Sequence, residues 1–191
     1  MKAVAFNCSP RAEGNTAGFI DVVMSVLESE GVATETVQVG GETIRGCQAC
    51  GVCREKKDGR CVYDDDILNH CIEKMVEADA IIIGSPVYFA DVTAEAKALI
   101  DRAGYVSRSN GNMLSRKIGA GVVTHRRAGS IHTLDSIHHL FTISDMFVVG
   151  SGYWTMGVGK APGDHLEDQE GLATMSRLGE NMAWLLKRIK E

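Results

Sequence analysis

The sequence predicts an α/β fold, in which five parallel strands form a doubly wound sheet with helices on both faces. Short apolar runs alternate with amphipathic stretches along all 191 residues. The run 80–83 is continuously apolar, as is typical of a central parallel strand that is covered on both faces. No repeat, low-complexity tract or linker divides the chain, so we expect one domain over residues 1–191.

Five apolar runs have the length and composition of strands. They lie at 2–6, 34–39, 80–84, 117–123 and 146–149. Apolar residues recur at helical spacing between these runs. This spacing predicts helices around 19–27, 67–75, 93–102, 130–144 and 172–189. The glycine-rich stretch 150–171 has only weak periodicity, which predicts a long loop.

Composition and charge exclude several classes of protein. The 45% hydrophobic and 24% charged residues are typical of a soluble globular protein. Twenty basic against 25 acidic residues, with no dense basic block, argue against a nucleic-acid partner. No apolar run is long enough to span a membrane, and the first residues lack a signal-peptide core, so we expect a cytoplasmic protein without a membrane partner.

The segment after the first strand has the chemistry of a phosphate site. Ser9, Asn15 and Thr16 supply side-chain donors, and Arg11 adds a cation beside the start of the next helix. Free amides at a helix N-terminus favour an anion. The segment matches neither the Walker A nor the dinucleotide-binding pattern. The alternative is a polar turn in which Ser9 or Asn15 only caps the helix.

Four of the six cysteines form the pattern C-x2-C-x2-C-x7-C at Cys47, Cys50, Cys53 and Cys61, in a loop at about 45–63. In a reducing cytosol such a group favours metal binding over disulfides. Compact runs of this kind suit a [4Fe-4S] cluster, whereas structural zinc more often uses two separated pairs. A zinc site and an empty or partly oxidised site remain as alternatives. Cys71 lies on an apolar helix face and is expected in the core.

Three motifs, in order, carry a resemblance to a known family. They are Ser9-Pro10-Arg11-x-x-Gly14-Asn15-Thr16, Gly84-Ser85-Pro86-Val87-Tyr88-Phe89 and Lys97-x-x-x-Asp101-Arg102. Together they resemble the NADPH-dependent FMN reductase family, and the cysteine loop makes its iron-sulfur flavoprotein branch the nearest match. The resemblance implies a flavodoxin-like fold with the FMN phosphate in the first loop. Cys8 departs from the glycine expected there, and we interpret it as a packed core thiol.

The resemblance also implies a site for the flavin ring. Pro86, Val87, Tyr88 and Phe89 would contact the ring, since a proline-fixed backbone and aromatic surface suit it. In relatives the loop after the fourth strand also approaches the ring, which adds Thr124 and Gly129. Basic residues in that loop could attract the phosphates of NADPH, although a solvated loop explains them equally well. Lys97 and Asp101 are interpreted as a helix-surface ion pair.

These observations favour an FMN-dependent oxidoreductase that passes electrons through FMN and a [4Fe-4S] cluster. No side chain has the pattern of an acid, base or nucleophile, so the flavin is expected to be the catalytic centre. The donor would be NAD(P)H or a ferredoxin-like protein, and the acceptor is undetermined. Two alternatives are an NAD(P)H-dependent FMN or quinone reductase whose cysteine site is structural or empty, and a non-enzymatic redox sensor or electron carrier.

Two further expectations concern assembly and the path of electrons. The cysteine loop follows the second strand, so it is expected at the same sheet edge as the flavin loops. Electrons could then cross within one chain or between subunits. The family resemblance implies a homodimer or homotetramer.

Overall fold

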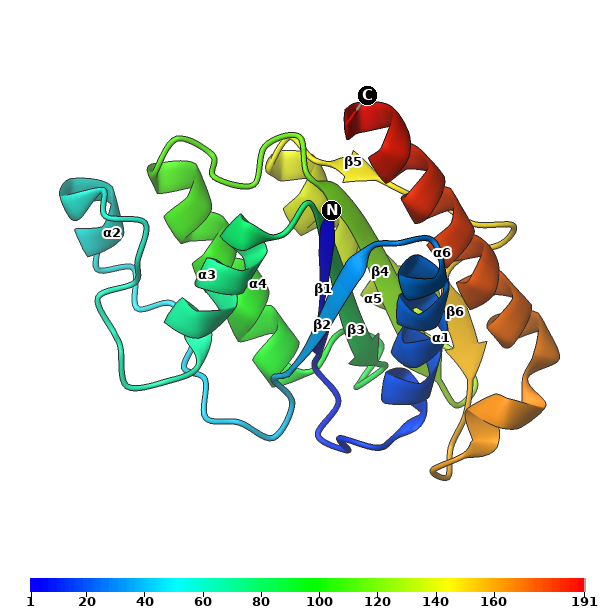
Figure 1. The fold of residues 1–191 in the computed structure, drawn as a ribbon. Helices are drawn as coiled ribbons and strands as arrows, with labels where there is room; N and C mark the ends of the chain where they lie inside the picture. The colour runs from blue at the N-terminus through cyan, green and yellow to red at the C-terminus, as the bar shows by residue number, and fades with distance from the viewer. Residues whose placement is uncertain (191) are drawn as a thin grey trace.

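The computed structural model describes residues 1–190 as one parallel sheet between two layers of helices (Figure 1). The strands are β1 (Lys2–Asn7), β2 (Ala33–Gln38), β3 (Ala80–Pro86), β4 (Ile118–His125) and β5 (Phe147–Val148). Their order in the sheet is β2-β1-β3-β4-β5, and each neighbouring pair is parallel. This is the strand order of flavodoxin-like proteins, so the predicted fold class is confirmed.

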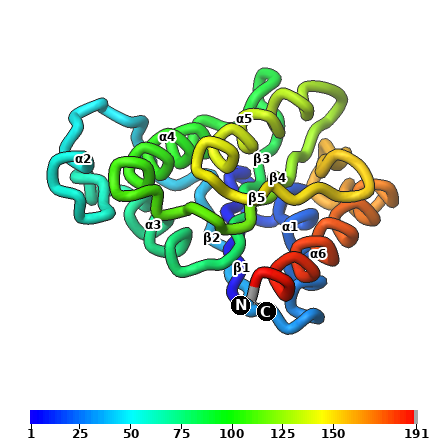
Figure 2. Tube along the Cα trace, turned by 90° about the horizontal axis from the view of Figure 1, so that it is seen from above, coloured from blue at the N-terminus to red at the C-terminus, as the bar shows by residue number. Residues whose placement is uncertain are grey.

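Helices bury both faces of this sheet (Figure 2). One face is covered by α1 (Asn15–Ser29) and α6 (Gln169–Lys190), and the other by α3 (Leu68–Glu77), α4 (Ala94–Ser109) and α5 (Ser130–Ile143). Ile81 and Ile83 of β3 pack into one core, whereas Ile82 packs into the other. Burial on both sides explains why this strand is continuously apolar. Within residues 1–190 no helix is long and apolar enough to cross a membrane.

The prediction of a structureless loop over 150–171 is wrong. This segment contains β6 (Met156–Val158), which pairs in parallel with the end of β4, and the 3-10 helix η1 (Asp164–Glu167). Because β5 pairs only with the start of β4, the two short strands divide the fifth position of the sheet. Elements of three or four residues are too short to produce a measurable hydrophobic period, which is why the sequence did not reveal them.

Helix α4 extends seven residues beyond its predicted end at Arg102. Its N-cap is Thr93, whose side chain accepts a hydrogen bond from the amide of Ala96 at 3.2 Å. Ala103 and Val106 continue its buried face into the core. The cysteine loop contains one short helix, α2 (Val52–Lys56), which packs against α4. Helix α4 therefore links the carboxyl edge of the sheet to the cysteine loop.

Candidate functional site

A cavity of about 200 Å³ opens at the carboxyl edge of the sheet, where ligands bind in open α/β folds. Its lining comprises Ser9, Arg11, Gly14, Asn15, Thr16, Pro86, Val87, Tyr88, Thr124, Arg126, Gly159 and Lys160. The loops after β1, β3 and β4 thus meet at one place. Of the residues predicted to bind FMN, only Phe89 and Gly129 lie outside this lining.

The first turn of α1 has no side-chain cap. Its N-cap is Gly14, and no side chain bonds to the first amides. Ser9 Oγ instead accepts a hydrogen bond from the amide of Arg11 at 3.2 Å, which leaves the hydroxyl hydrogen for a ligand. The alternative in which Ser9 or Asn15 caps the helix is therefore wrong. Uncapped amides and a hydroxyl donor beside one cavity suit a phosphate.

Asn15 lines the cavity, but its side chain is already bonded to a distant segment. Its Nδ2 donates to the carbonyl of Ala161 at 2.8 Å, and its Oδ1 accepts from the amide of Gly163 at 3.0 Å. These bonds tie the start of α1 to the segment before η1. Asn15 therefore stabilises the wall of the cavity, whereas the sequence suggested that its side chain is a free donor for a ligand.

The loop after β3 is held by backbone hydrogen bonds. The amide of Val87 donates to the carbonyl of Thr124 at 2.8 Å, and Tyr88 and Asp91 exchange two further backbone bonds. Phe89 and Ala90 have φ of 48° and 67°, so the chain reverses sharply there. Tyr88 stays at the cavity, whereas the side chain of Phe89 is fully exposed. Phe89 therefore does not line the cavity, and its contact with the ring stays a prediction.

Thr124 and Gly129 serve different purposes. The Oγ1 atom of Thr124 is buried and has no hydrogen-bond partner among the described residues. An unsatisfied buried hydroxyl is costly, which fits a polar group of a bound ligand at this position. Gly129 has φ of 91°, and a Cβ there would lie 2.8 Å from Val87 and 3.0 Å from Ala90. Gly129 thus supports the loop after β3 and does not itself line the cavity.

Two residues that line the sheet-edge cavity come from the segment 150–171, which was predicted to be a loop. Gly159 and Lys160 follow β6, which brings them over the start of α1. A Cβ at Gly159 would lie 2.4 Å from Asn15 Nδ2, so only glycine permits this approach. The carboxylate of Asp164 accepts from the amides of Lys160 and Ala161 at 2.9 and 2.7 Å. In the sequence, only the glycine-rich composition around Lys160 indicated that this segment could approach a ligand.

The four clustered cysteines line a second, smaller cavity of about 20 Å³ beside α4. Cys53 is buried, Cys61 is half-buried, and Cys47 and Cys50 are exposed. Within residues 1–190 no group of three or more His, Cys, Asp or Glu side chains is arranged to hold a metal ion. The structure therefore brings the four thiols to one cavity without converging them on a single point. Four thiols around one cavity are the donor set that an iron-sulfur cluster requires.

A buried cation lies against this cysteine cavity. The Arg102 side chain is 1% exposed and forms an ion pair with Asp66, which is equally buried. Arg102 Nη2 donates to Cys61 Sγ and to the carbonyl of Tyr63, both at 3.2 Å. The sequence analysis did not predict this pair. The partners are 36 positions apart, which is too far for a local pattern to indicate the pair.

Comparison with known proteins decides the family. The model of the NADPH-dependent FMN reductase family matches residues 1–161. An iron-sulfur flavoprotein of Methanocaldococcus jannaschii is 38% identical over the full length of both chains. One of Methanosarcina thermophila is 34% identical over all of this chain and 98% of the relative.

The chain belongs to the NADPH-dependent FMN reductase family. The full-length relatives place it in the iron-sulfur flavoprotein branch, which confirms the resemblance seen in the sequence. Among solved structures, an archaeal flavodoxin superposes with a TM-score of 0.65 at 18% identity, covering 98% of this chain and 99% of the flavodoxin. This member of the family is therefore a flavin-dependent oxidoreductase, and FMN is its flavin.

Two other cysteines are core residues in this family member, as predicted. Cys8 and Cys71 are fully buried. Burial raises the pKa of the Cys71 thiol to about 12 and also raises the pKa of Cys8 far above its usual value. Both are therefore protonated at neutral pH. Neither lines the cysteine cavity, so neither belongs to the cysteine site.

The two cavities of this reductase-family chain are separated along α4. The helix begins at Thr93, whose Oγ1 donates to the carbonyl of Cys8 at 2.9 Å, beside the flavin cavity. Arg102 and Val106, further along the helix, line the cysteine cavity. Arg102 and Val106 lie about 14–20 Å along the helix axis from Thr93, because each residue of a helix adds 1.5 Å. The cysteine loop begins at the carboxyl edge of the sheet, as predicted, but then runs back along α4. The four thiols therefore lie away from this edge, and the expectation that the loop lies beside the flavin loops is wrong.

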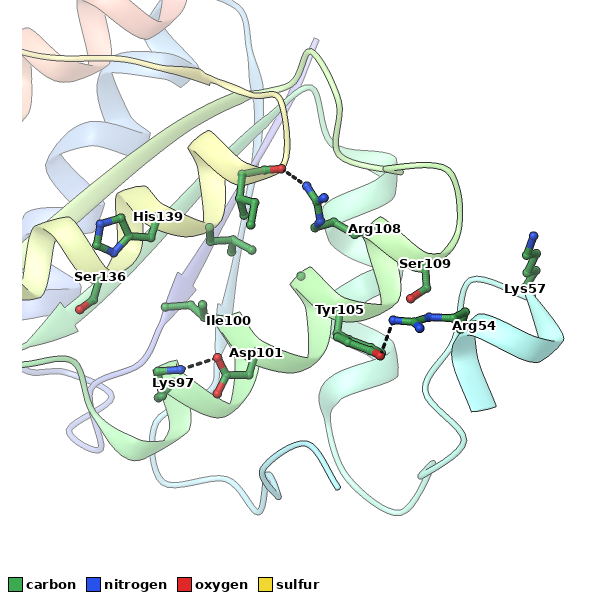
Figure 3. A pocket seen from close by; sticks show the side chains of 13 residues that line it. Arg54, Lys57, Lys97, Ile100, Asp101, Tyr105, Arg108, Ser109, Ser136 and His139 are labelled. Carbon is green, nitrogen blue, oxygen red and sulfur yellow. Dashed lines mark hydrogen bonds and ion pairs between the residues drawn. The ribbon is translucent and has the colours of Figure 1, made fainter. Parts of the chain in front are cut away.

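A larger groove of about 720 Å³ lies between α4 and α5, next to α2 (Figure 3). Its cationic residues are Arg54, Lys57, Lys97 and Arg108. Arg54 donates to the Tyr105 hydroxyl at 2.7 Å. Lys97 and Asp101 form the exposed i, i+4 ion pair that the sequence predicted. The groove is thus a mostly cationic surface with an apolar floor, and Tyr105 lines both this groove and the cysteine cavity.

Proposed function

We propose that this protein is an iron-sulfur flavoprotein that moves electrons between a donor and an acceptor through FMN and one [4Fe-4S] cluster. The observation that carries this proposal is the single cavity shared by four thiols, in a chain whose sheet edge has the features of an FMN site. Its relatives are named iron-sulfur flavoproteins, which supports the same proposal. We place its activity in the reducing cytoplasm, where free thiols persist.

The flavin cavity would hold FMN through its loops. Ser9, Thr16 and the uncapped first amides of α1 would bind the phosphate, while Arg11 and Lys160 balance its charge. Bound FMN supplies hydride and single-electron chemistry.

The other two loops would orient the ring. Pro86, Val87 and Tyr88 would lie against it, and the Thr124 hydroxyl would meet one of its polar atoms. No side chain is required to move a proton, since the reaction is centred on the flavin.

The cysteine cavity would hold the cluster through Cys47, Cys50, Cys53 and Cys61. Cys53 and Cys61 form the buried side, whereas Cys47 and Cys50 face solvent. A cluster at this place would be open to a partner on one side. We propose that the donor is NAD(P)H or a ferredoxin-like protein, and that the acceptor is a small molecule or protein.

We further propose a homodimer or homotetramer in which electrons cross between subunits. Exchange between subunits agrees with a cysteine cavity that lies away from the carboxyl edge of the sheet. Both redox sites also reach the surface, at Tyr88 and Phe89 and at Cys47 and Cys50. A solution mass of two or four times 20.6 kDa by light scattering would support this assembly, and a monomeric mass would contradict it.

Protein purified without oxygen is expected to contain about four irons and four acid-labile sulfides per chain, beside one FMN. Cys53→Ala should remove most of the iron, because it deletes one ligand. Cys71→Ala is the matched control, since Cys71 is equally buried but lies outside the cavity, and iron should be retained. Iron, sulfide and the visible spectrum are the measurements.

Flavin without iron, or with stoichiometric zinc, would contradict the cluster. The protein would then be an NAD(P)H-dependent flavin or quinone reductase with a structural thiol loop. The lack of a converged metal set within residues 1–190 is the observation that favours this second candidate.

Ser9→Ala and Thr16→Ala are each expected to weaken FMN binding roughly tenfold to a hundredfold. A hydrogen bond to a charged group contributes about 1.5–3 kcal/mol, and 1.4 kcal/mol corresponds to a factor of ten. Ser29→Ala, at the far end of the same helix, is the control, because its hydroxyl bonds only to the carbonyl of Val26. Fluorescence titration of the apoprotein with FMN measures the effect. Unchanged affinity in both variants would refute the phosphate assignment.

A further inference from the structure

Arg102 is a charged side chain buried inside the cysteine cavity. The residue is only 2% exposed, although it carries a permanent charge, and it reaches the thiols from the middle of α4. Burying a guanidinium is costly unless it is paired and hydrogen-bonded. A cation kept at this place therefore requires a physical reason.

The contacts of Arg102 fix its guanidinium against one thiol. Nη2 donates to Cys61 Sγ and to the carbonyl of Tyr63, both at 3.2 Å. Nη1 donates to the carbonyl of Arg45 at 3.1 Å and to the carboxylate of Asp66. Nε is buried without a partner among the described residues. Carbonyls from both ends of the cysteine loop thus hold the cation on Cys61.

Asp66 is held as firmly as its partner. Its carboxylate accepts from the amides of Arg45 and Leu68 at 3.2 and 3.1 Å, in addition to Arg102. It pairs with Nη1, whereas Cys61 is bonded to Nη2. The guanidinium therefore lies between its counter-ion and the thiol, with one nitrogen bonded to each.

We propose that Arg102 sets the reduction potential of the cluster through its charge and hydrogen bond at Cys61, with Asp66 as the counter-ion that partly offsets this charge. This inference rests on the proposed function, because it requires the cluster. The potential of a protein-bound cluster depends on net charge, hydrogen bonds to sulfur and solvent exposure. Arg102 acts on the first two, through its charge and its hydrogen bond to Cys61 Sγ.

The sign of the effect follows from electrostatics. A cluster that gains one electron becomes more negative, so a nearby positive charge stabilises the reduced form and raises the potential. A nearby carboxylate has the opposite effect. The expected order of potentials is D66N highest, then the natural protein, then R102K, then R102M. R102K keeps the charge but loses the fork of donors, so it should lie between the natural protein and R102M.

The test is a redox titration of the holoprotein, in which electron paramagnetic resonance follows the cluster and absorbance follows FMN. R102M is expected to change the one-electron equilibrium constant of the cluster by about tenfold, which is 59 mV. D66N should shift it in the opposite direction. D101N, on the exposed side of the same helix, removes one carboxylate outside the cavity and should leave it unchanged. The FMN potential in each sample is an internal control.

Opposite shifts in D66N and an Arg102 variant would support the proposal, since a purely structural role gives no reason for opposite signs. Shifts of the same sign, or none, would overturn it. If R102M does not fold, R102K and D66N still provide the comparison. Natural protein with no iron or sulfide would overturn the proposed function first, whereas a normal cluster with unmoved potentials would overturn only the role of Arg102.

Discussion

Asp66→Ala is expected to lower the free energy of unfolding by about 3–5 kcal/mol, because it leaves a buried guanidinium without its counter-ion. Both side chains of the Arg102–Asp66 pair are only 1% exposed. The amides of Arg45 and Leu68 would also lose their acceptor. Urea unfolding of the natural and variant proteins, followed by circular dichroism, measures the difference.

The exposed pair on α4 provides the matched control. Lys97 and Asp101 have side chains that are 54% and 45% exposed, so Asp101→Ala should cost less than about 1 kcal/mol. Equal losses in Asp66→Ala and Asp101→Ala would contradict the importance of burial.

The contribution of Asp66 should also depend on pH. Burial opposes ionisation of Asp66, but hydrogen bonds from Arg102 and two amides outweigh it and lower its pKa. A lowered pKa in the folded state stabilises the protein fully above the ordinary aspartate pKa of about 3.9, and this stability is lost as the pH falls through the lowered value. The gap in stability between the natural protein and Asp66→Ala should therefore shrink in acid.

Gly40→Ala is expected to abolish retention of FMN and to cost about 1–3 kcal/mol in stability. A Cβ at this position would lie 2.2 Å from the carbonyl carbon of Ser9 and 2.6 Å from that of Cys8. Backbone atoms cannot rotate away as a side chain does, so the phosphate loop must shift. The ratio of FMN to protein after gel filtration, and the affinity of the apoprotein for FMN, would report the loss.

Gly152→Ala tests whether any glycine substitution has this effect. A Cβ at Gly152 meets nothing within 4 Å, and this residue is not among those with positive φ. We expect normal flavin content and stability. Full FMN retention in Gly40→Ala would mean that the loop carrying Ser9 does not hold the phosphate.

The sequence predicted the fold well where elements are long and regular. Burial of the sheet on both faces requires apolar strands and amphipathic helices, and these patterns are visible without a structure. It failed for β6 and η1, because elements of three or four residues are too short to leave a periodic pattern. The same failure hid Gly159 and Lys160, which that segment carries into the flavin cavity.

Local motifs identified most of the candidate flavin-binding residues, but they did not predict the contacts that each side chain makes. Ser9 and Thr16 line the cavity as expected, whereas the Asn15 side chain is tied to the segment before η1. Phe89 is fully exposed, because left-handed backbone at two successive residues turns it away from the cavity. A side chain's hydrogen-bond partner is set by neighbours that are distant in sequence, and no local pattern encodes them.

The sequence by itself determined the order of the long elements, the family and the residue types of the phosphate segment and the cysteine loop, since each depends on residue types at short spacings. Only the tertiary structure decided where those sites lie relative to each other. It placed the thiols along α4, away from the flavin edge, and it brought Asp66 and Arg102 together inside the cysteine cavity. Long-range burial is a property of the packed chain, because a charge is paired or unpaired only once the surrounding core has excluded water.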